Sequence, residues 1–360
     1  MKQRAPAPEE TCTIVPKKDP SQEALRELRA MERDEPSPEG VARLRTLIAH
    51  RSGYVVGRAA KLAGEWQAGG LIPELLAAFE RFLQDPAKQD PGCAAKQAII
   101  GALVALAHND PEIFLRASRY VQREPGYVGD NPDAWKARPL RRVWEDIEPS
   151  RDDDTAATLR GMAGDGLLGC HYSEAYHVVA GLLMDKEART RRVAMETLAG
   201  APSEQSELLI RMALLAGEPE PDIFNLGLQG LMAINGERSL EFVAGFLDSP
   251  ELPVAEGAAL AIGEARLPES FPMLRRAWNS HRWTADRAAL ALPIALTRDD
   301  GACAFLMDVI RDGREQLAGA ALKALSIYAS QPERVAEIRA AVDARGSREL
   351  AQLFNQVFEA

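Results

Sequence analysis

Residues 246–264 read FLDSPELPVAEGAALAIGE, and this stretch decides the fold. A polar turn with Asp, Ser and Pro separates an apolar segment from a second one, in which the small residues Ala258 and Ala259 are paired among larger apolar residues. Proline interrupts a helix, and Asp or Ser can cap the next one. Small residues let neighbouring helices approach closely. The stretch therefore predicts two antiparallel helices joined by a tight turn.

The same pattern recurs through the second half of the chain, with 31 or 32 residues between successive turns and 30 to 33 between successive small residues. The junctions between apolar segment and turn fall at Leu183, Leu215, Leu247, Trp278, Ile310 and Val342. The small residues of the following segments fall at Gly164, Ala194, Gly227, Ala258, Ala288 and Ala320, with Ala59 at the same phase in the first half. Because two sets of positions on different segments give the same period, we interpret the chain as a repeat array.

This period predicts an all-α, right-handed α-solenoid of about nine antiparallel helix pairs. The predicted pairs cover residues 41–66, 71–107, 111–169, 174–200, 203–234, 237–266, 269–296, 299–329 and 332–358. Ala and Leu supply 100 residues, against 41 for Val, Ile and Thr, which favours helix over sheet. We expect residues 1–20 to form a disordered arm and residues 21–360 to form one cooperative body, led by a helix near 21–33 with Ser21 as its N-cap.

The phrase VAEGAALAIGE after FLDSPEL resembles the signature of short HEAT repeats. Over most of the chain after residue 40, the sequence is similar to bacterial HEAT-repeat proteins, including those called PBS-lyase-like after the bilin lyases. The resemblance implies a helical solenoid and leaves the function open. The usual Arg after Val is replaced at Val56 and Ala255, so those helix starts should depend less on an Arg–Asp ladder.

Composition limits the classes of partner. The net charge of −10 lowers the expectation of nucleic-acid binding, because phosphate contacts require a basic surface. The four cysteines form no CxxC pair and are interpreted as small core residues of a reducing compartment. No secretory signal is evident, and the longest apolar run, residues 98–107, is too short to span a bilayer. We expect a soluble, cytoplasmic protein.

The third repeat carries a long insertion at about residues 124–152. A long connection within a compact array is usually functional or disordered. Aromatic and Arg side chains are typical anchors of a binding surface, and the candidates here are Tyr127, Trp135, Arg141, Arg142 and Trp144. Three interpretations stay open: the two tryptophans pack back on the solenoid, the insertion contacts a ligand or partner, or it is disordered.

Two motifs suggest cofactor or metal chemistry but lack the necessary context. Gly164, Gly166 and Gly169 match GxGxxG, yet the repeat places them inside a helix and not after a strand. His171 and His177 are six residues apart and do not share a helical face. The resemblance to iron-binding HEAT hydroxylases fails because none of the five histidines is followed by Glu. We predict no catalytic residue, cofactor or metal.

Arginines at the starts of the second helices indicate one further surface. Arg192, Trp283 and Arg287 are candidates, together with Arg189, Arg191 and Arg282. Some HEAT-like enzymes excise bases from DNA through a basic groove, but acidic segments such as residues 218–222 oppose that function here. Solvated helix starts are the plainer interpretation.

Three hypotheses about function therefore follow from the sequence. The first is a non-catalytic scaffold that binds a protein or peptide through its concave groove. The second is a lyase-like or enzyme-accessory protein that holds a small ligand near the insertion at 124–152. The third and weakest is nucleic-acid binding.

Overall fold

The computed structural model describes residues 20–124, 153–280 and 287–359. The predicted arm therefore lies outside the described residues, except for its last residue. The chain divides into two compact units, one ending at Leu159 and the other beginning at Arg160. The division falls within helix α8 (Ala157–Gly169). The expectation of one cooperative body stays a prediction.

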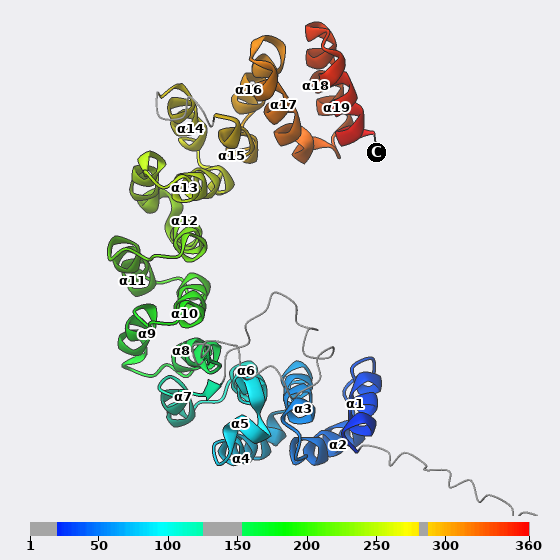
Figure 1. Cartoon of the computed structure of the whole chain (residues 1–360), viewed down its shortest axis with the longest axis vertical. Helices are drawn as coiled ribbons and strands as arrows, with labels where there is room; N and C mark the ends of the chain where they lie inside the picture. Colours follow the sequence, from blue (N-terminus) through cyan, green and yellow to red (C-terminus); the bar gives the residue numbers. More distant parts are fainter. Residues whose placement is uncertain (1–19, 125–152, 281–286, 360) are drawn as a thin grey trace, which may run out of the picture. The chain divides into compact units, whose positions relative to one another are not determined.

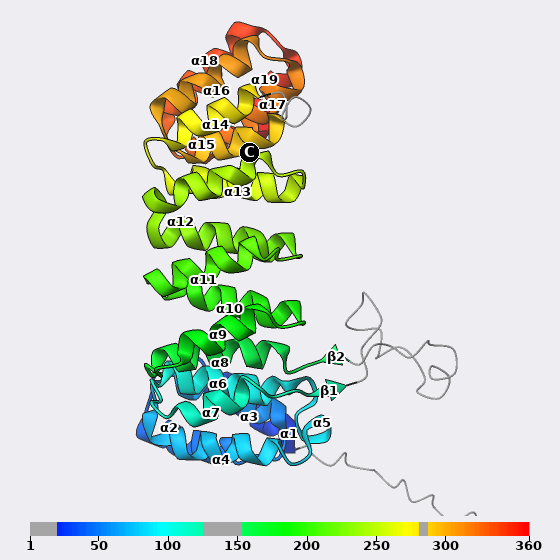
Figure 2. The same cartoon turned by 90° about the vertical axis from the view of Figure 1, so that its left-hand side faces the viewer.

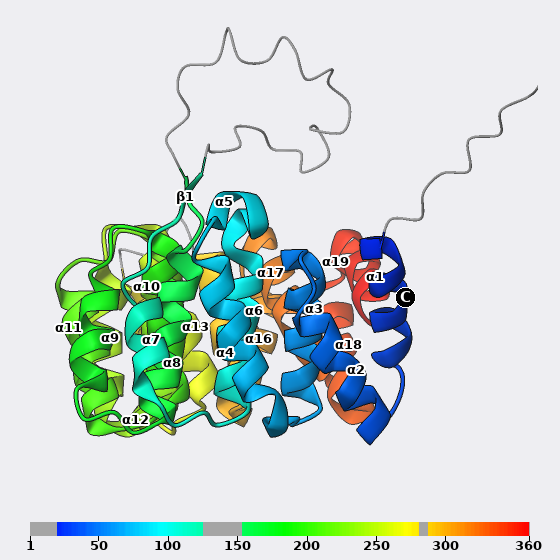
Figure 3. The same cartoon turned by 90° about the horizontal axis from the view of Figure 1, so that it is seen from below.

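The first unit is helical apart from one short strand pair among its described residues (Figure 1). Its elements are α1 (Pro20–Met31), α2 (Pro38–Ile48), α3 (Gly53–Glu65), α4 (Ile72–Phe82), α5 (Pro86–Gln89), α6 (Ala94–Ala105), α7 (Pro111–Ala117), β1 (Arg123–Glu124) and β2 (Asp153–Asp154). Helix α3 packs against α2 and α6, and α4 packs against α6 (Figure 3). Strands β1 and β2 pair antiparallel, with Arg123 opposite Asp154 (Figure 2).

The second unit consists of helices stacked in two layers, of which α9 and α11 belong to one and α10 and α12 to the other (Figure 1). Its remaining elements are α9 (Ala175–Leu183), α10 (Ala188–Gly200), α11 (Glu204–Leu215), α12 (Pro221–Ala244), α13 (Leu252–Ala265), α14 (Ser270–Asn279), α15 (Ala291–Leu296), α16 (Asp300–Asp312), α17 (Glu315–Ala324), α18 (Pro332–Arg345) and α19 (Arg348–Phe358). One continuous apolar core runs between these helices. The all-α class and the predicted helix pairs are confirmed.

Local chemistry explains where the helices begin and end. Ser37, Asp110 and Asp299 each accept a hydrogen bond from a backbone N–H in the first turn of the helix that follows. Helix α12 contains the second helix of the fifth pair and the first helix of the sixth. The predicted turn between them appears as a kink at Asn235 (φ −156°), whose side chain accepts a hydrogen bond from the N–H of Arg238.

One local prediction is wrong. Helix α1 already begins at Pro20, so Ser21 lies inside the helix and is not its N-cap. Helix α15 follows directly on a 3₁₀ segment (Arg287–Leu290), and Pro293 lies in its first turn, where an N–H would have no intrahelical partner. Gly263 permits the close approach of this turn, since an added Cβ would lie 2.3 Å from the carbonyl oxygen of Pro293.

Candidate functional site

The residues predicted from the sequence to form a binding surface are not brought together within the described residues. Tyr127, Trp135, Arg141, Arg142, Trp144 and Trp283 lie outside the described residues. Arg192, on α10, is half-exposed and lies 3.7 Å from the carboxylate of Asp222. Arg287 is partly buried before α15, and its Nε has no hydrogen-bond partner among the described residues. These two arginines belong to different repeats.

Arg191, the neighbour of Arg192, has a structural role. Its Nε and Nη2 donate to the two carboxylate oxygens of Glu218, both at 2.8 Å, and its Nη1 donates to the carbonyl oxygens of Asp185 and Lys186. Both side chains are almost fully buried. This arginine joins α10 to the turn after α11 and is not available to a nucleic-acid phosphate, contrary to the suggested surface role.

The preceding repeat also has a buried pair between an arginine of a second helix and a carboxylate in the turn that follows the next helix. Arg160 on α8 donates through Nε and Nη2 to the two carboxylate oxygens of Asp185, at 2.8 and 3.0 Å. Burial favours the neutral form of Asp185, but hydrogen bonds from Arg160 and from the N–H of Glu187 outweigh it and hold the pKa of this carboxyl below its usual range. Two successive repeats of the second unit are therefore joined by buried Arg–carboxylate pairs.

The glycine motif has a packing role. Gly164 lies within α8, where an added Cβ would contact Val179 at 3.2 Å. Gly169 lines a cavity of about 440 Å³ between α8 and α10 whose charged lining residues, Asp165 and Glu196, are both acidic. Acidic side chains would repel a pyrophosphate, so this lining does not suit a dinucleotide. No group of three metal-ligating side chains gathers among the described residues.

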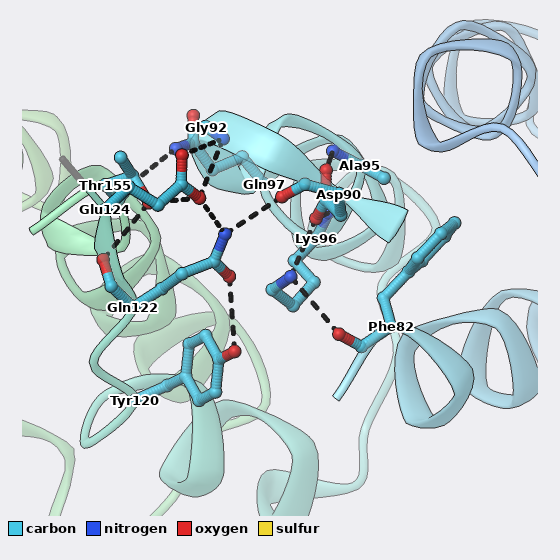
Figure 4. A network of polar contacts seen from close by, with 10 residues as sticks. All are labelled: Phe82, Asp90, Gly92, Ala95, Lys96, Gln97, Tyr120, Gln122, Glu124 and Thr155. Atoms are coloured by element: carbon cyan, nitrogen blue, oxygen red, sulfur yellow. Dashed lines mark hydrogen bonds and ion pairs between the residues drawn. The ribbon is translucent and has the colours of Figure 1, made fainter. Parts of the chain in front are cut away.

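A buried polar network lies between the start of α6 and strand β1 in the first unit (Figure 4). Lys96 Nζ donates to Asp90 Oδ2 at 2.8 Å, and both side chains are excluded from solvent. The Asp90 carboxylate also accepts hydrogen bonds from the backbone N–H groups of Ala95 and Lys96, at 2.7 and 3.1 Å. Asp90 thus caps α6 and compensates the charge of a buried lysine.

The network continues from Asp90 to the paired strands. Gln122 Nε2 donates to the backbone oxygen of Asp90 at 2.9 Å and also to Glu124. Glu124 in turn accepts hydrogen bonds from the N–H of Gly92, and Thr155 N–H donates to the carbonyl oxygen of Gln122. These contacts join β1 and β2 to the loop that precedes α6.

Reactive groups near this network are held neutral. Burial raises the pKa of the Cys93 thiol to about 12, although the charge of Lys96 opposes it. Burial likewise raises the pKa of Tyr120 to about 12, and the hydroxyl donates to Gln122 Oε1 at 3.2 Å. Because thiolate chemistry requires a lowered pKa, Cys93 is not an activated nucleophile. We assign the network to structure.

One face of α11 in the second unit exposes large apolar side chains. Leu208, Met212 and Leu215 are 57, 57 and 70% exposed. Their spacing of four and three residues places all three on one helical face. Met184 follows the C-terminal end of α9, the helix against which α11 packs, and is 60% exposed. We call these four residues the α11 apolar face.

Comparison with neighbouring repeats shows that this face is local. The buried Leu214, and not the exposed Leu215, matches the buried Leu183 and Leu247, so the neighbouring helices align at 31 and 33 residues. Positions 31 residues earlier carry His177, Gly181 and Met184, and positions 33 residues later carry Glu241, Gly245 and Asp248. All of these residues are exposed. A repeat array requires apolar residues where its helices pack against each other. Leu208, Met212 and Leu215 are apolar but exposed on one face of a helix, so packing within the array does not explain them. Sequence periodicity could not identify this face, since Leu and Met there look like core residues.

No model of a known protein family matches this chain, and no curated protein matches it either. Among solved structures, an engineered protein is 14% identical, with 96% of this chain and 97% of that chain covered and a TM-score of 0.32. The complex of CpcE and CpcF of phycocyanin lyase from Nostoc sp. PCC7120 is also 14% identical, with 87% and 96% covered and a TM-score of 0.32. Likenesses at this level indicate no function for this chain. None of the helices in the described part of the chain is long and apolar enough to cross a membrane.

Proposed function

We propose that this chain is a non-catalytic helical-repeat protein that binds another protein, and that the α11 apolar face makes the contact. The observation that supports this is the exposure of Leu208, Met212 and Leu215 on one face of one helix. Leaving three large apolar side chains in water is unfavourable, by roughly 25 cal/mol for each Å² that a partner could cover. This face lies on α11, the first helix of its pair. The hypothesis from the sequence placed the contact in the concave groove instead.

The surroundings of the face specify the chemistry of the partner. On the repeat that follows, Glu241 and Asp248 occupy the positions equivalent to Leu208 and Leu215, and neither forms an ion pair with a described cation. On the repeat that precedes, Gly181 leaves the surface open, since nothing lies within 4 Å of an added Cβ. An amphipathic helix with apolar residues at i, i+3 or i+4 and i+7, flanked by Lys or Arg on one side, would complement this pattern.

Site-specific photo-cross-linking in the host cell tests the proposal. A photoreactive amino acid placed at Met212 is expected to give one discrete adduct with a second protein, because that side chain is at the centre of the face. The matched control is the same amino acid at Arg276, an exposed position on α14, an equivalent first helix two repeats later. The readout is the mass and identity of the adduct, by gel and mass spectrometry.

Three outcomes separate the interpretations. A discrete heterologous adduct at position 212 that is missing at 276 supports the proposal. An adduct of twice the mass of the chain identifies a second copy of this chain as the occupant and contradicts binding of a different protein. Equal labelling at both positions, or none at 212, shows that the face is ordinary exposed surface and also contradicts it.

A further inference from the structure

The first unit contains a cavity of about 880 Å³ beside the α2–α3 turn. It is lined by that turn, by the end of α4 and by the segment from α5 to the start of α6. Its charged residues are Arg51, Arg81, Lys88 and Asp90. Three cations and one carboxylate in a chain with a net charge of −10 make this a locally basic cavity.

The cations of this cavity are not neutralised by the protein. None of the three forms an ion pair with a described carboxylate, whereas arginines elsewhere in the same unit do, such as Arg45 with Glu74 and Arg116 with Glu80. The carboxylate of Asp90 is already compensated by Lys96. The cavity therefore keeps an excess of positive charge.

Arg81 is held in place by the backbone and not by a carboxylate. Its Nη2 donates to the carbonyl oxygens of Ile48 and His50, at 3.1 and 3.0 Å, at the end of α2. Its Nε is excluded from solvent and has no hydrogen-bond partner among the described residues. Burial without a compensating carboxylate lowers the pKa of this group. An anion in the cavity would relieve that cost.

The N-terminus of α3 adds to the same field. Ser52 precedes the helix without capping it through its side chain, and Gly53 is the first helical residue. An added Cβ on Gly53 would lie 2.8 Å from the backbone oxygen of Gln89, so only glycine permits this approach to the cavity wall. The first N–H groups of a helix have no partner within it and favour an anion.

We propose that this cavity binds a phosphorylated small molecule, with Arg51, Arg81 and Lys88 contacting the phosphoryl group. A guanidinium provides a fork of donors and a lysine a compact point charge, and both are common ligands of phosphate. The cavity is larger than one phosphate, and Tyr54 and Gln84 offer an aromatic surface and an amide to the remainder of the molecule. A polycarboxylate presents similar charge, so the experiment compares both kinds of anion.

Isothermal titration calorimetry of the full chain at low ionic strength tests this site, with pyrophosphate and citrate as the probes. The double variant Arg51→Gln/Lys88→Gln changes two exposed side chains and leaves the anchored Arg81 intact. We expect it to weaken pyrophosphate binding at least tenfold, the change that corresponds to about 1.4 kcal/mol. Arg29→Gln, which removes one exposed and unpaired cation of α1, is the control and should leave the affinity unchanged.

The possible results decide the proposal. Saturable pyrophosphate binding that is lost in the double variant, retained in Arg29→Gln and stronger than citrate binding supports it. Tighter binding of citrate overturns the phosphoryl assignment. Equal affinity in the double variant and the wild type, or no saturable binding of pyrophosphate at millimolar concentration, overturns the site itself. Because the cavity and the α11 apolar face lie on different units, either proposal can fail without the other.

Discussion

Asp90→Ala is expected to destabilise the first unit by about 3–5 kcal/mol, because it leaves the ammonium group of Lys96 buried without its counter-charge. The same change removes the two hydrogen bonds that cap α6. The measurement is hydrogen exchange of the α6 amides, which should become about tenfold faster for each 1.4 kcal/mol of lost stability.

Asp85→Ala is the matched control for this prediction. Asp85 is exposed and precedes α5 without a side-chain cap, so its removal should change stability by no more than about 0.5 kcal/mol. Adding Lys96→Met to Asp90→Ala should restore part of the loss, because the uncompensated charge is then gone. Equal exchange rates in Asp90→Ala and Asp85→Ala would show that the buried pair does not hold this unit together.

Arg191→Ala is expected to cost the second unit about 3–5 kcal/mol, because Glu218 would remain buried and charged without a partner. The Glu218 side chain is only 4% exposed, so water cannot replace the guanidinium. Hydrogen exchange of the amides in α10 and α12 measures the effect, since the pair joins α10 to the turn that precedes α12.

The adjacent Arg192→Ala provides the comparison. Arg192 and Asp222 are 43 and 86% exposed and 3.7 Å apart, and exposed pairs contribute about 0–1 kcal/mol. Both variants remove one positive charge from α10. The difference between their losses of stability therefore reports the effect of burying the ion pair. If Arg192→Ala were as destabilising as Arg191→Ala, the assignment of Arg191 to structure would be wrong.

The helix pairs could be predicted because their cause is periodic. A turn after each apolar segment and a small residue within each second helix recur at a regular interval. Each repeat is therefore evidence for the assignment of its neighbours. The kink at Asn235 appears where the period requires a turn, although the helix is otherwise continuous there. The prediction of Ser21 as an N-cap was wrong because a single residue specifies a helix end less firmly than a repeat specifies helices.

The candidate sites could not be predicted because they depend on contacts that the period does not encode. Arg51, Arg81 and Lys88 come from three segments, and only the folded chain places them around one cavity. Arg191 and Arg192 are neighbours in sequence, and a rotation of about 100° on the helix buries one and exposes the other. Leu208, Met212 and Leu215 match a core pattern until their exposure is known.

The most direct test of the α11 apolar face combines binding and stability in one variant, Leu208→Ser/Met212→Ser/Leu215→Ser. The quantity measured is the Kd of the partner identified by cross-linking, beside the hydrogen exchange of α11, with Leu252→Ser at an exposed position on α13 as the control. We predict that the triple variant binds at least about 100-fold more weakly while the exchange of α11 stays near that of the wild type, because these side chains contribute to contact and not to the core. An unchanged Kd in the triple variant would contradict the claim that this face is where the chain binds another protein.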